Sequence, residues 1–148
     1  NQDGCDEVAG GVDMARKRRG YTIGNRKVAL IGAGFVGSSI AYALALRDVA
    51  REIVLIDINK EKAQGEAMDI RHGLPAMGTV DLYAGHYSDC ADCDLIIITA
   101  GRGRKPGESR LDLMNENVRI AKLVVYSIKE HYTRVIIMLI SNPRYSDL

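Results

Sequence analysis

The stretch of sequence that decides the fold is KVALIGAGFVG, which occupies residues 27–37. A short apolar run comes first, as in a buried strand, and a glycine turn then leads into a helical pattern. Gly32, Gly34 and Gly37 have the G-x-G-x-x-G spacing. The first glycine permits the tight turn, the second lets the backbone approach a pyrophosphate, and the third lets the helix pack close to the strand. The stretch therefore predicts a strand–turn–helix unit whose helix N-terminus faces an anion.

A second strand ends in a carboxylate at the distance that this motif requires. Residues 52–57 read EIVLID, and Asp57 lies 20 positions after Gly37. A carboxylate there can accept hydrogen bonds from the ribose hydroxyls of adenosine and repels a 2′-phosphate, so it favours NAD over NADP. Lys60 lies close by and weakens that preference slightly. The alternatives are a glycine turn that binds nothing and an acidic residue that only ends its strand.

Apolar runs alternate with helical patterns along the rest of the chain. Buried strands are predicted over residues 27–31, 53–57, 80–84, 95–99 and 135–140. Helices are predicted over residues 35–47, 60–72 (capped by Asn59) and 111–131. Their expected inward-facing residues are Val36, Ile40, Ala43 and Leu44; Ala63, Ala67 and Ile70; and Val118, Ala121, Val124 or Val125, and Ile128. This alternation predicts an α/β fold with a doubly wound, mostly parallel sheet and right-handed crossovers.

Length and composition bound the class of protein. The chain has 148 residues, a net charge of +1 and 47% hydrophobic residues, as in one globular domain. The charge gives no reason to expect nucleic acid, and no apolar run is long enough to span a membrane. No signal-peptide pattern is visible. Residues 1–25 read as a solvated arm with a basic run at 16–19, or as an arm that clasps another subunit, and residues 26–148 as the domain.

The three cysteines do not indicate a metal site. Cys90 and Cys93 form a single C-x-x-C, whereas zinc needs two more ligands at a suitable spacing. A thioredoxin-like motif would begin a helix after a strand, but this pair precedes a strand. We therefore predict no metal and plain reduced cysteines in a cytoplasmic protein. The three histidines have no partner that indicates catalysis.

A basic, glycine-bearing loop follows the fourth predicted strand. Residues 101–110 read GRGRKPGESR. The loop lies at the carboxyl end of a central strand, where open α/β sheets bind ligands. Arginine suits two-pronged carboxylate recognition, and such a loop can close over a bound anion. Asn142, after the last strand, faces the same crevice, and its amide can contact a substrate oxygen or a nicotinamide. The alternatives are a solvated basic loop and an asparagine that only forms a turn.

In this order and with these gaps, the motifs strongly resemble the L-lactate/malate dehydrogenase family. The resemblance covers about residues 26–143 and is carried by VALIGAGFVG at 28–37, Asp57, ITAG at 98–101, RKPGESRLDL at 104–113 and SNP at 141–143. It implies a Rossmann NAD-binding domain, NAD as cofactor and a small 2-oxo or 2-hydroxy acid as substrate. It also implies a homo-oligomer for an intact family member.

The resemblance implies roles for individual residues. Arg110 matches the loop arginine that polarises the substrate carbonyl during hydride transfer, and Arg104 occupies the specificity position of that loop. Asn142 matches a substrate-contacting asparagine. Cofactor contacts are implied for Gly32, Ala33, Gly34, Phe35, Val36, Gly37, Asp57, Thr99, Ala100, Gly101, Asn117, Ile140 and Asn142.

Two departures keep alternatives open. Arginine at position 104 usually selects the second carboxylate of oxaloacetate, whereas PGESRLDL at 106–113 is similar to the lactate branch, including some bacterial enzymes. We therefore predict an L-lactate dehydrogenase, with a malate dehydrogenase as the alternative. Members of the family continue after SNP into a second domain, which carries the catalytic histidine. Residues 144–148 do not resemble that continuation. The chain is thus expected to be the cofactor-binding half, inactive alone; the other alternative is a non-catalytic nucleotide-binding fragment.

Overall fold

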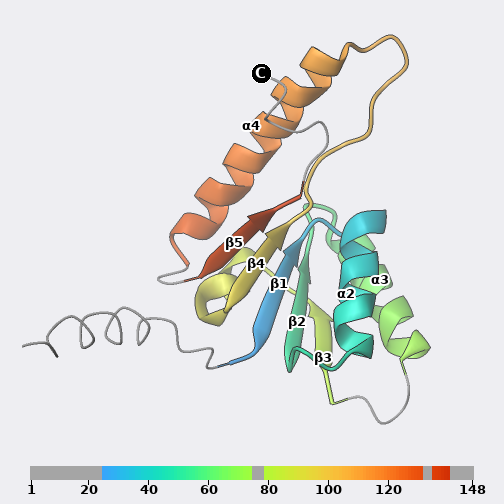
Figure 1. Cartoon of the computed structure of the whole chain (residues 1–148), viewed down its shortest axis with the longest axis vertical. Helices are drawn as coiled ribbons and strands as arrows, with labels where there is room; N and C mark the ends of the chain where they lie inside the picture. The colour runs from blue at the N-terminus through green and yellow to red at the C-terminus, as the bar shows by residue number, and fades with distance from the viewer. Residues whose placement is uncertain (1–24, 75–78, 132–134, 141–148) are drawn as a thin grey trace, which may run out of the picture.

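The computed structural model describes residues 25–74, 79–131 and 135–140. Its sheet has five parallel strands in the order β3-β2-β1-β4-β5. The strands are β1 (Lys27–Ile31), β2 (Glu52–Ile56), β3 (Asp81–Ala84), β4 (Leu95–Ile98) and β5 (Ile136–Leu139). The helices are α2 (Phe35–Leu46), α3 (Lys60–Gly73), α4 (Arg110–Lys129) and the 3-10 helix η1 (Tyr87–Asp92). The predicted doubly wound α/β fold is confirmed (Figure 1).

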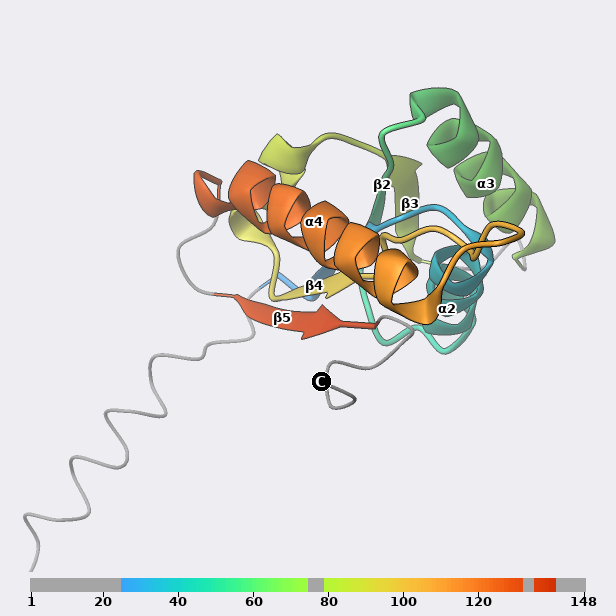
Figure 2. The ribbon, with the colours of Figure 1, turned by 90° about the horizontal axis from the view of Figure 1, so that it is seen from above.

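The sheet is covered on both faces, which explains why its central strands are apolar throughout. On one face α2 and α3 pack their small residues Ala41, Ala45 and Ala67 against β1, β2 and β3. On the other face Val124 and Ile128 of α4, together with η1, cover the opposite side of the same strands. Figure 2 shows α4 running along its own face of the sheet, with α2 and α3 at the far side. The order of the strands reverses between β1 and β4, and a crevice forms at such a switch point.

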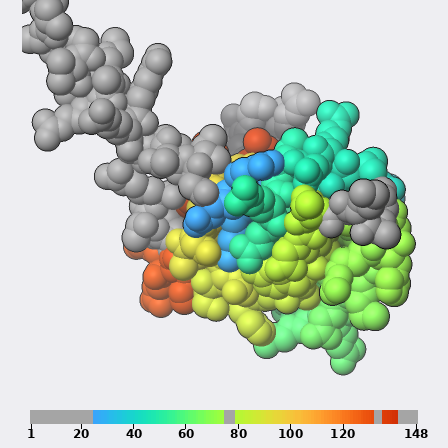
Figure 3. All heavy atoms as spheres, turned by 90° about the horizontal axis from the view of Figure 1, so that it is seen from below, coloured from blue at the N-terminus to red at the C-terminus, as the bar shows by residue number. Residues whose placement is uncertain are grey.

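A charged cluster around the buried Lys27 lies at the amino end of β1. The Lys27 side chain is 5% exposed, and its Nζ lies 2.7 Å from Asp92 Oδ1 and 3.6 Å from Glu52 Oε2. Burial alone would lower the pKa of Lys27, but the hydrogen bond to Asp92 and the nearby charges hold it above its usual value. Tyr83 donates to Glu52 at 2.8 Å, and burial with this bond raises the pKa of Tyr83 to about 12. From below, the blue start of β1 lies beside the yellow segment around η1 (Figure 3).

The helix that follows the glycine turn is rotated relative to the prediction. The residues of α2 that are buried are Gly37, Ala41 and Ala45, whereas Val36 is 49% exposed and Ala43 is also exposed. The predicted inward face was therefore wrong in part, although Ile40 and Leu44 do pack against the core. The reason is that the third glycine of the motif must face the strand, which sets the phase of the helix so that every fourth residue after it points inward.

The other two helices follow their patterns. The Asn59 side chain accepts a hydrogen bond from Lys62 N at 3.0 Å, so the predicted cap of α3 is confirmed. Ala63, Ala67 and Ile70 are buried as predicted. In α4, Val124 is buried and Val125 is 38% exposed, which decides between the two alternatives.

The burial predicted for the last strand was wrong. All four residues of β5 are exposed, by 36% to 48%, and the strand pairs with β4 alone among the described residues. An apolar run of this length is typical of a strand covered on both faces, but the pattern cannot reveal whether a strand has a second neighbour. Among the helices of the described ranges, none combines the length and the apolar character that crossing a bilayer requires.

Candidate cofactor site

The glycine turn between β1 and α2 is built by close backbone contacts. Gly32 has a φ of +109°, a conformation that favours glycine, and a Cβ there would lie 2.8 Å from Thr99 Oγ1. A Cβ on Gly37 would lie 1.9 Å from the carbonyl oxygen of Gly32. A Cβ on Gly34 would meet no atom within 4 Å. Gly32 and Gly37 are therefore required by the fold, whereas Gly34 leaves open space at the start of α2.

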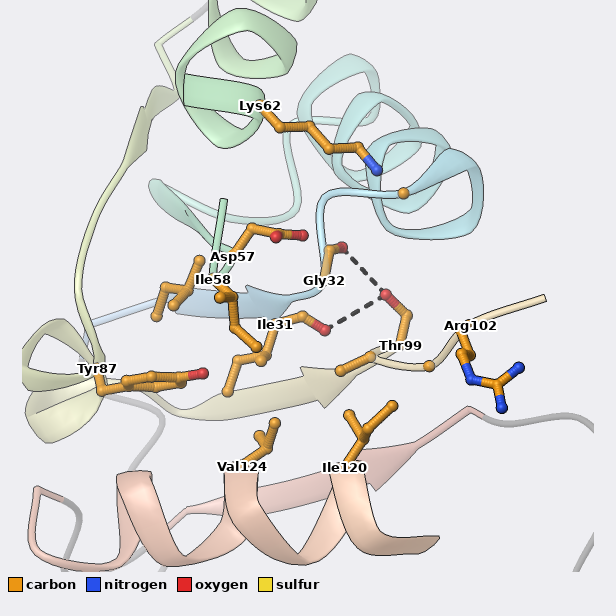
Figure 4. A pocket seen from close by; sticks show the side chains of 14 residues that line it. Ile31, Gly32, Asp57, Ile58, Lys62, Tyr87, Thr99, Arg102, Ile120 and Val124 are labelled. Carbon is orange, nitrogen blue, oxygen red and sulfur yellow. Dashed lines mark hydrogen bonds between the residues drawn. The ribbon is translucent and has the colours of Figure 1, made fainter. Parts of the chain in front are cut away.

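The end of β4 is tied to this turn. Thr99 Oγ1 lies 3.1 Å from the carbonyl oxygen of Gly32 and 3.4 Å from that of Ile31, and it donates toward both (Figure 4). Thr99 N also donates to Ile31 O at 2.8 Å. These bonds hold the end of β4 against the glycine turn at the carboxyl end of the sheet.

Asp57 is held at the edge of the pocket by two backbone groups. Its Oδ2 accepts from Ala33 N at 2.8 Å, and its Oδ1 accepts from Asn59 N at 2.9 Å. The carboxylate is thus fixed in orientation beside the turn, and each oxygen keeps lone pairs for a further donor. The cation beside it is Lys62, which lines the pocket and extends toward the glycine turn in Figure 4. Lys60, which the sequence also places close to Asp57, does not line this pocket.

Two hollows meet at the carboxyl end of β4. The first is a pocket of about 210 Å³ between the glycine turn, η1 and α4, and the second is a pocket of about 240 Å³ between the start of α2 and β5. Thr99, Ala100, Gly101 and Arg102 line both pockets, so the two form one elongated crevice. An elongated crevice at the switch point suits a ligand with two bulky ends joined by an anionic centre.

Most of the predicted cofactor residues line this crevice. Gly32, Gly34 and Asp57 line the first pocket, and the second is lined by Val36, Asn117 and Ile140 in addition to the shared residues. Phe35 is 89% exposed, while Ala33 and Gly37 are buried, and these three line neither pocket. Asn142 lies outside the described residues.

The other walls of the first pocket were not predicted from the sequence. Its further lining residues are Ile58, Lys62, Tyr87, Arg102, Ile120 and Val124. Val124 was read only as a core residue, although it and Ile120 lie one turn apart on the face of α4 that also reaches the pocket. Burial chiefly raises the pKa of Tyr87, which is therefore neutral at pH 7 and presents an aromatic wall. No motif in the sequence marks Tyr87.

The basic loop is organised around Glu108. The Arg102 guanidinium binds the Glu108 carboxylate with both terminal nitrogens, and Lys105 N donates to Glu108 Oε2 at 3.0 Å. Arg104 Nε donates to the Glu108 carbonyl oxygen at 2.7 Å. The bonds from Arg102 and Lys105 lower the pKa of Glu108 to about 2, so the carboxylate stays ionised at neutral pH. The loop thus has a defined internal structure rather than being merely solvated.

The two arginines with predicted roles lie outside the crevice. Arg104 and Arg110 are exposed and line neither pocket. Arg110 is the first residue of α4, whose N-cap Ser109 accepts from Asp112 N at 3.1 Å. Arg102 N donates to Asn117 Oδ1 at 3.1 Å, which anchors the start of the loop to α4. The structure therefore brings together most of the residues that were predicted to bind the cofactor, whereas the two arginines that were predicted to bind the substrate lie outside the crevice.

The parallel sheet, the glycine turn and the carboxylate after β2 define a dinucleotide-binding domain of the Rossmann class. A family model described as the NAD binding domain of lactate/malate dehydrogenase matches residues 26–144. The chain belongs to this family, and NAD is its cofactor. The open space at Gly34 and the oriented carboxylate of Asp57 fit the pyrophosphate and ribose of NAD.

Curated relatives and solved structures agree with this family. The L-lactate dehydrogenase of Priestia megaterium is 50% identical over 123 residues, which are 83% of this chain and 39% of that protein. That of Thermoanaerobacter sp. (strain X514) is 51% identical and covers 79% of this chain and 38% of the relative.

Among solved structures, a lactate dehydrogenase from a Medee basin deep-sea metagenome library has a TM-score of 0.75 at 46% identity, covering 80% of this chain and 38% of that one. The malate dehydrogenase of Picrophilus torridus has a TM-score of 0.74 at 36% identity, and the match covers 79% of this chain and 38% of that one. The chain therefore spans under two fifths of the length of these relatives.

Proposed function

We propose that the protein containing this chain is an L-lactate dehydrogenase that interconverts pyruvate and L-lactate with NADH and NAD. The observation that carries the proposal is the crevice in which the open turn at Gly34 and the fixed Asp57 carboxylate face the same space. The relatives that bear the name L-lactate dehydrogenase, at 45–51% identity, support the lactate branch. A cytoplasmic location, a homo-oligomeric state and an N-terminal arm over residues 1–25 stay predictions.

The cofactor would lie along the crevice with its adenosine end in the first pocket and its nicotinamide end in the second. Asp57 would accept hydrogen bonds from the adenosine ribose, with Lys62, Ile58 and Tyr87 around the adenine end. The free N–H groups at the start of α2 would face the pyrophosphate. The nicotinamide would occupy the second pocket, beside Thr99, Ala100 and Gly101 and the residues Val36, Asn117 and Ile140. Bound NADH supplies the hydride for reduction of the 2-oxo acid.

The loop would bring two arginines to the substrate. Arg110 would donate to the carbonyl oxygen of the 2-oxo acid and stabilise the negative charge that develops there as hydride arrives. Arg104 would lie at the far end of the substrate, and Asn142 would contact a substrate oxygen. The resemblance assigns the proton donor to the second domain of the family, outside this chain.

Removal of the Asp57 carboxylate tests the ribose assignment. In the full-length protein, Asp57→Ala is expected to raise the Kd for NADH by about 10- to 100-fold, since a hydrogen bond to a charged group contributes about 1.5–3 kcal/mol. The affinity for NADPH should fall less, because the repulsion of its 2′-phosphate is also lost. Fluorescence titration with each cofactor measures both constants. Lys60→Ala is the matched control and should leave both Kd values nearly unchanged. Equal affinities for NADH in the wild type and in Asp57→Ala would contradict the ribose assignment.

The alternative activity is malate dehydrogenase, and Arg104 is the residue that favours it. A guanidinium at the specificity position can bind a second carboxylate, which oxaloacetate has and pyruvate lacks. Arg104→Gln is therefore expected to lower kcat/KM for oxaloacetate by at least about 10-fold relative to pyruvate. Initial rates of NADH oxidation with each substrate give the ratio. Lys105→Gln removes a neighbouring charge as a control, and a ratio that stays constant in Arg104→Gln would show that Arg104 does not select the substrate.

A further inference from the structure

The two cysteines of the C-x-x-C segment lie beside the cofactor pocket and take no part in the proposed reaction. Cys90 is 0% and Cys93 4% exposed, and both belong to the apolar cluster that includes Ile31, Ile56 and Val124. These three residues also line the first pocket. The two thiols therefore lie in the same layer, between the sheet and α4, as the floor of the pocket.

The geometry of η1 places the two sulfurs together. A 3-10 helix has three residues per turn and rises about 2.0 Å per residue, so residues i and i+3 lie on one side with their Cα atoms about 6 Å apart. Disulfides join Cα atoms that lie about 4.4–6.8 Å apart. Cys93 N donates to Cys90 O at 3.3 Å, so the backbone between the two cysteines forms one closed turn. The spacing of the two Cα atoms within this turn therefore suits a disulfide.

The surroundings make the two thiols unequal. The hydrogen bond from Cys93 and, to a smaller extent, the positive charge of Lys27 lower the pKa of the Cys90 thiol. The hydrogen bond to Cys90 and burial raise the pKa of the Cys93 thiol. These directions favour Cys90 as the attacking thiol of the pair and Cys93 as the thiol that reacts second.

Asp89 connects this pair to the cofactor pocket. Its backbone carbonyl accepts from Cys93 Sγ at 3.5 Å, and its carboxylate accepts from His86 N at 2.7 Å, which fixes the start of η1. Tyr87 directly follows His86 as the first residue of η1, and its ring forms a wall of the pocket (Figure 4). A disulfide would remove the thiol donor from Asp89, whose carboxylate is bonded to the residue that precedes Tyr87.

We propose that Cys90 and Cys93 are a reversible redox-active dithiol, oxidised by low-molecular-weight disulfides, and that the resulting disulfide weakens NAD binding through Tyr87. The Cys90 thiolate attacks one sulfur of the oxidant R–S–S–R and expels RS⁻, which takes up a proton as RSH. Cys93 then loses its proton, attacks the Cys90 sulfur of the mixed disulfide and expels the second RS⁻, which takes up that proton as RSH. Two thiols are oxidised and one small disulfide is reduced to two thiols. Because both sulfurs are buried, the reaction requires transient opening of η1.

The disulfide is tested by mass spectrometry of the full-length protein incubated with oxidised glutathione. Trypsin releases residues 72–102 as one peptide, which contains Cys90 and Cys93 but not Cys5. We expect this peptide to lose two hydrogen atoms, to resist alkylation and to regain two alkylatable thiols after dithiothreitol. NADH at saturation should slow the oxidation, since it holds Tyr87 in place. A peptide that stays reduced in the folded protein but forms the bond in urea would overturn the proposal.

The coupling to the cofactor rests on the proposed pocket and has its own readout. The oxidised protein is expected to bind NADH about 5-fold more weakly than the reduced protein, with recovery in dithiothreitol. Cys93→Ser should keep its affinity in oxidised glutathione, whereas Cys5→Ser should lose affinity as the wild type does. An unchanged Kd after complete disulfide formation would contradict the coupling. Failure of the reduced protein to bind NADH would instead refute the cofactor site. The mass of the peptide would still show whether the disulfide forms.

Discussion

Gly37→Ala is expected to destabilise the protein by about 3 kcal/mol or more, because the added methyl group would overlap the backbone. Its Cβ would lie 1.9 Å from the carbonyl oxygen of Gly32, and that oxygen belongs to the turn itself. No side-chain rotation can relieve the overlap, so α2 would have to move away from β1. Urea unfolding of the full-length protein measures the loss, and NADH binding should fall together with it.

Gly34→Ala is the matched variant, and it separates folding from cofactor binding. Gly34 has a φ of −81°, and a Cβ there would meet nothing within 4 Å, so the free energy of unfolding should change by less than about 0.5 kcal/mol. The methyl group would occupy the space through which the backbone approaches the pyrophosphate, and the Kd for NADH should rise by at least about 10-fold. Wild-type affinity in Gly34→Ala would show that the pyrophosphate lies elsewhere; wild-type stability in Gly37→Ala would contradict the close packing of the turn.

Arg110→Gln is expected to lower kcat for pyruvate reduction by about 100- to 1,000-fold, which is the usual loss when a donor to a developing oxyanion is removed. The Kd for NADH should stay the same, because Arg110 is exposed and lines neither pocket of the crevice. Stopped-flow rates of NADH oxidation, with NADH binding measured separately, distinguish the two effects.

Two further variants sharpen the assignment of Arg110. Arg110→Lys keeps the charge but not the planar fork, and it should have an intermediate rate. Arg119→Gln removes an arginine whose side chain is 72% exposed and which pairs only weakly with Glu116, at 3.8 Å, so kcat should be unaffected. A loss of less than about threefold in Arg110→Gln would remove this residue from the proposed chemistry.

The turn at the start of the fold could be predicted because its glycines have local, geometric causes. The spacing of Gly32 and Gly37 already implies the contact of the helix with the strand, and the structure shows it. The inward face of α2 could not be read from apolar periodicity, because that contact, rather than the size of the side chains, sets the rotation of the helix. The exposure of β5 depends on whether another segment covers it, which a strand's own residues do not encode.

One side of the cofactor crevice, formed by the glycine turn and Asp57, could be predicted from the sequence. Its other side is assembled from segments far apart in the sequence: Ile58 follows β2, Tyr87 begins η1, and Ile120 lies on α4. These residue types are common and carry no spacing signal, so only the folded chain brings them together. The same holds for the Arg102–Glu108 pair, which organises the loop although neither residue was predicted to bind another.

The most direct test of the central claim is the rate of NADH oxidation by the full-length protein with pyruvate and with oxaloacetate, alongside NADH binding. An NAD-dependent L-lactate dehydrogenase binds NADH and has a higher kcat/KM for pyruvate than for oxaloacetate. A higher kcat/KM for oxaloacetate, or NADH binding without turnover of either substrate, would contradict the account.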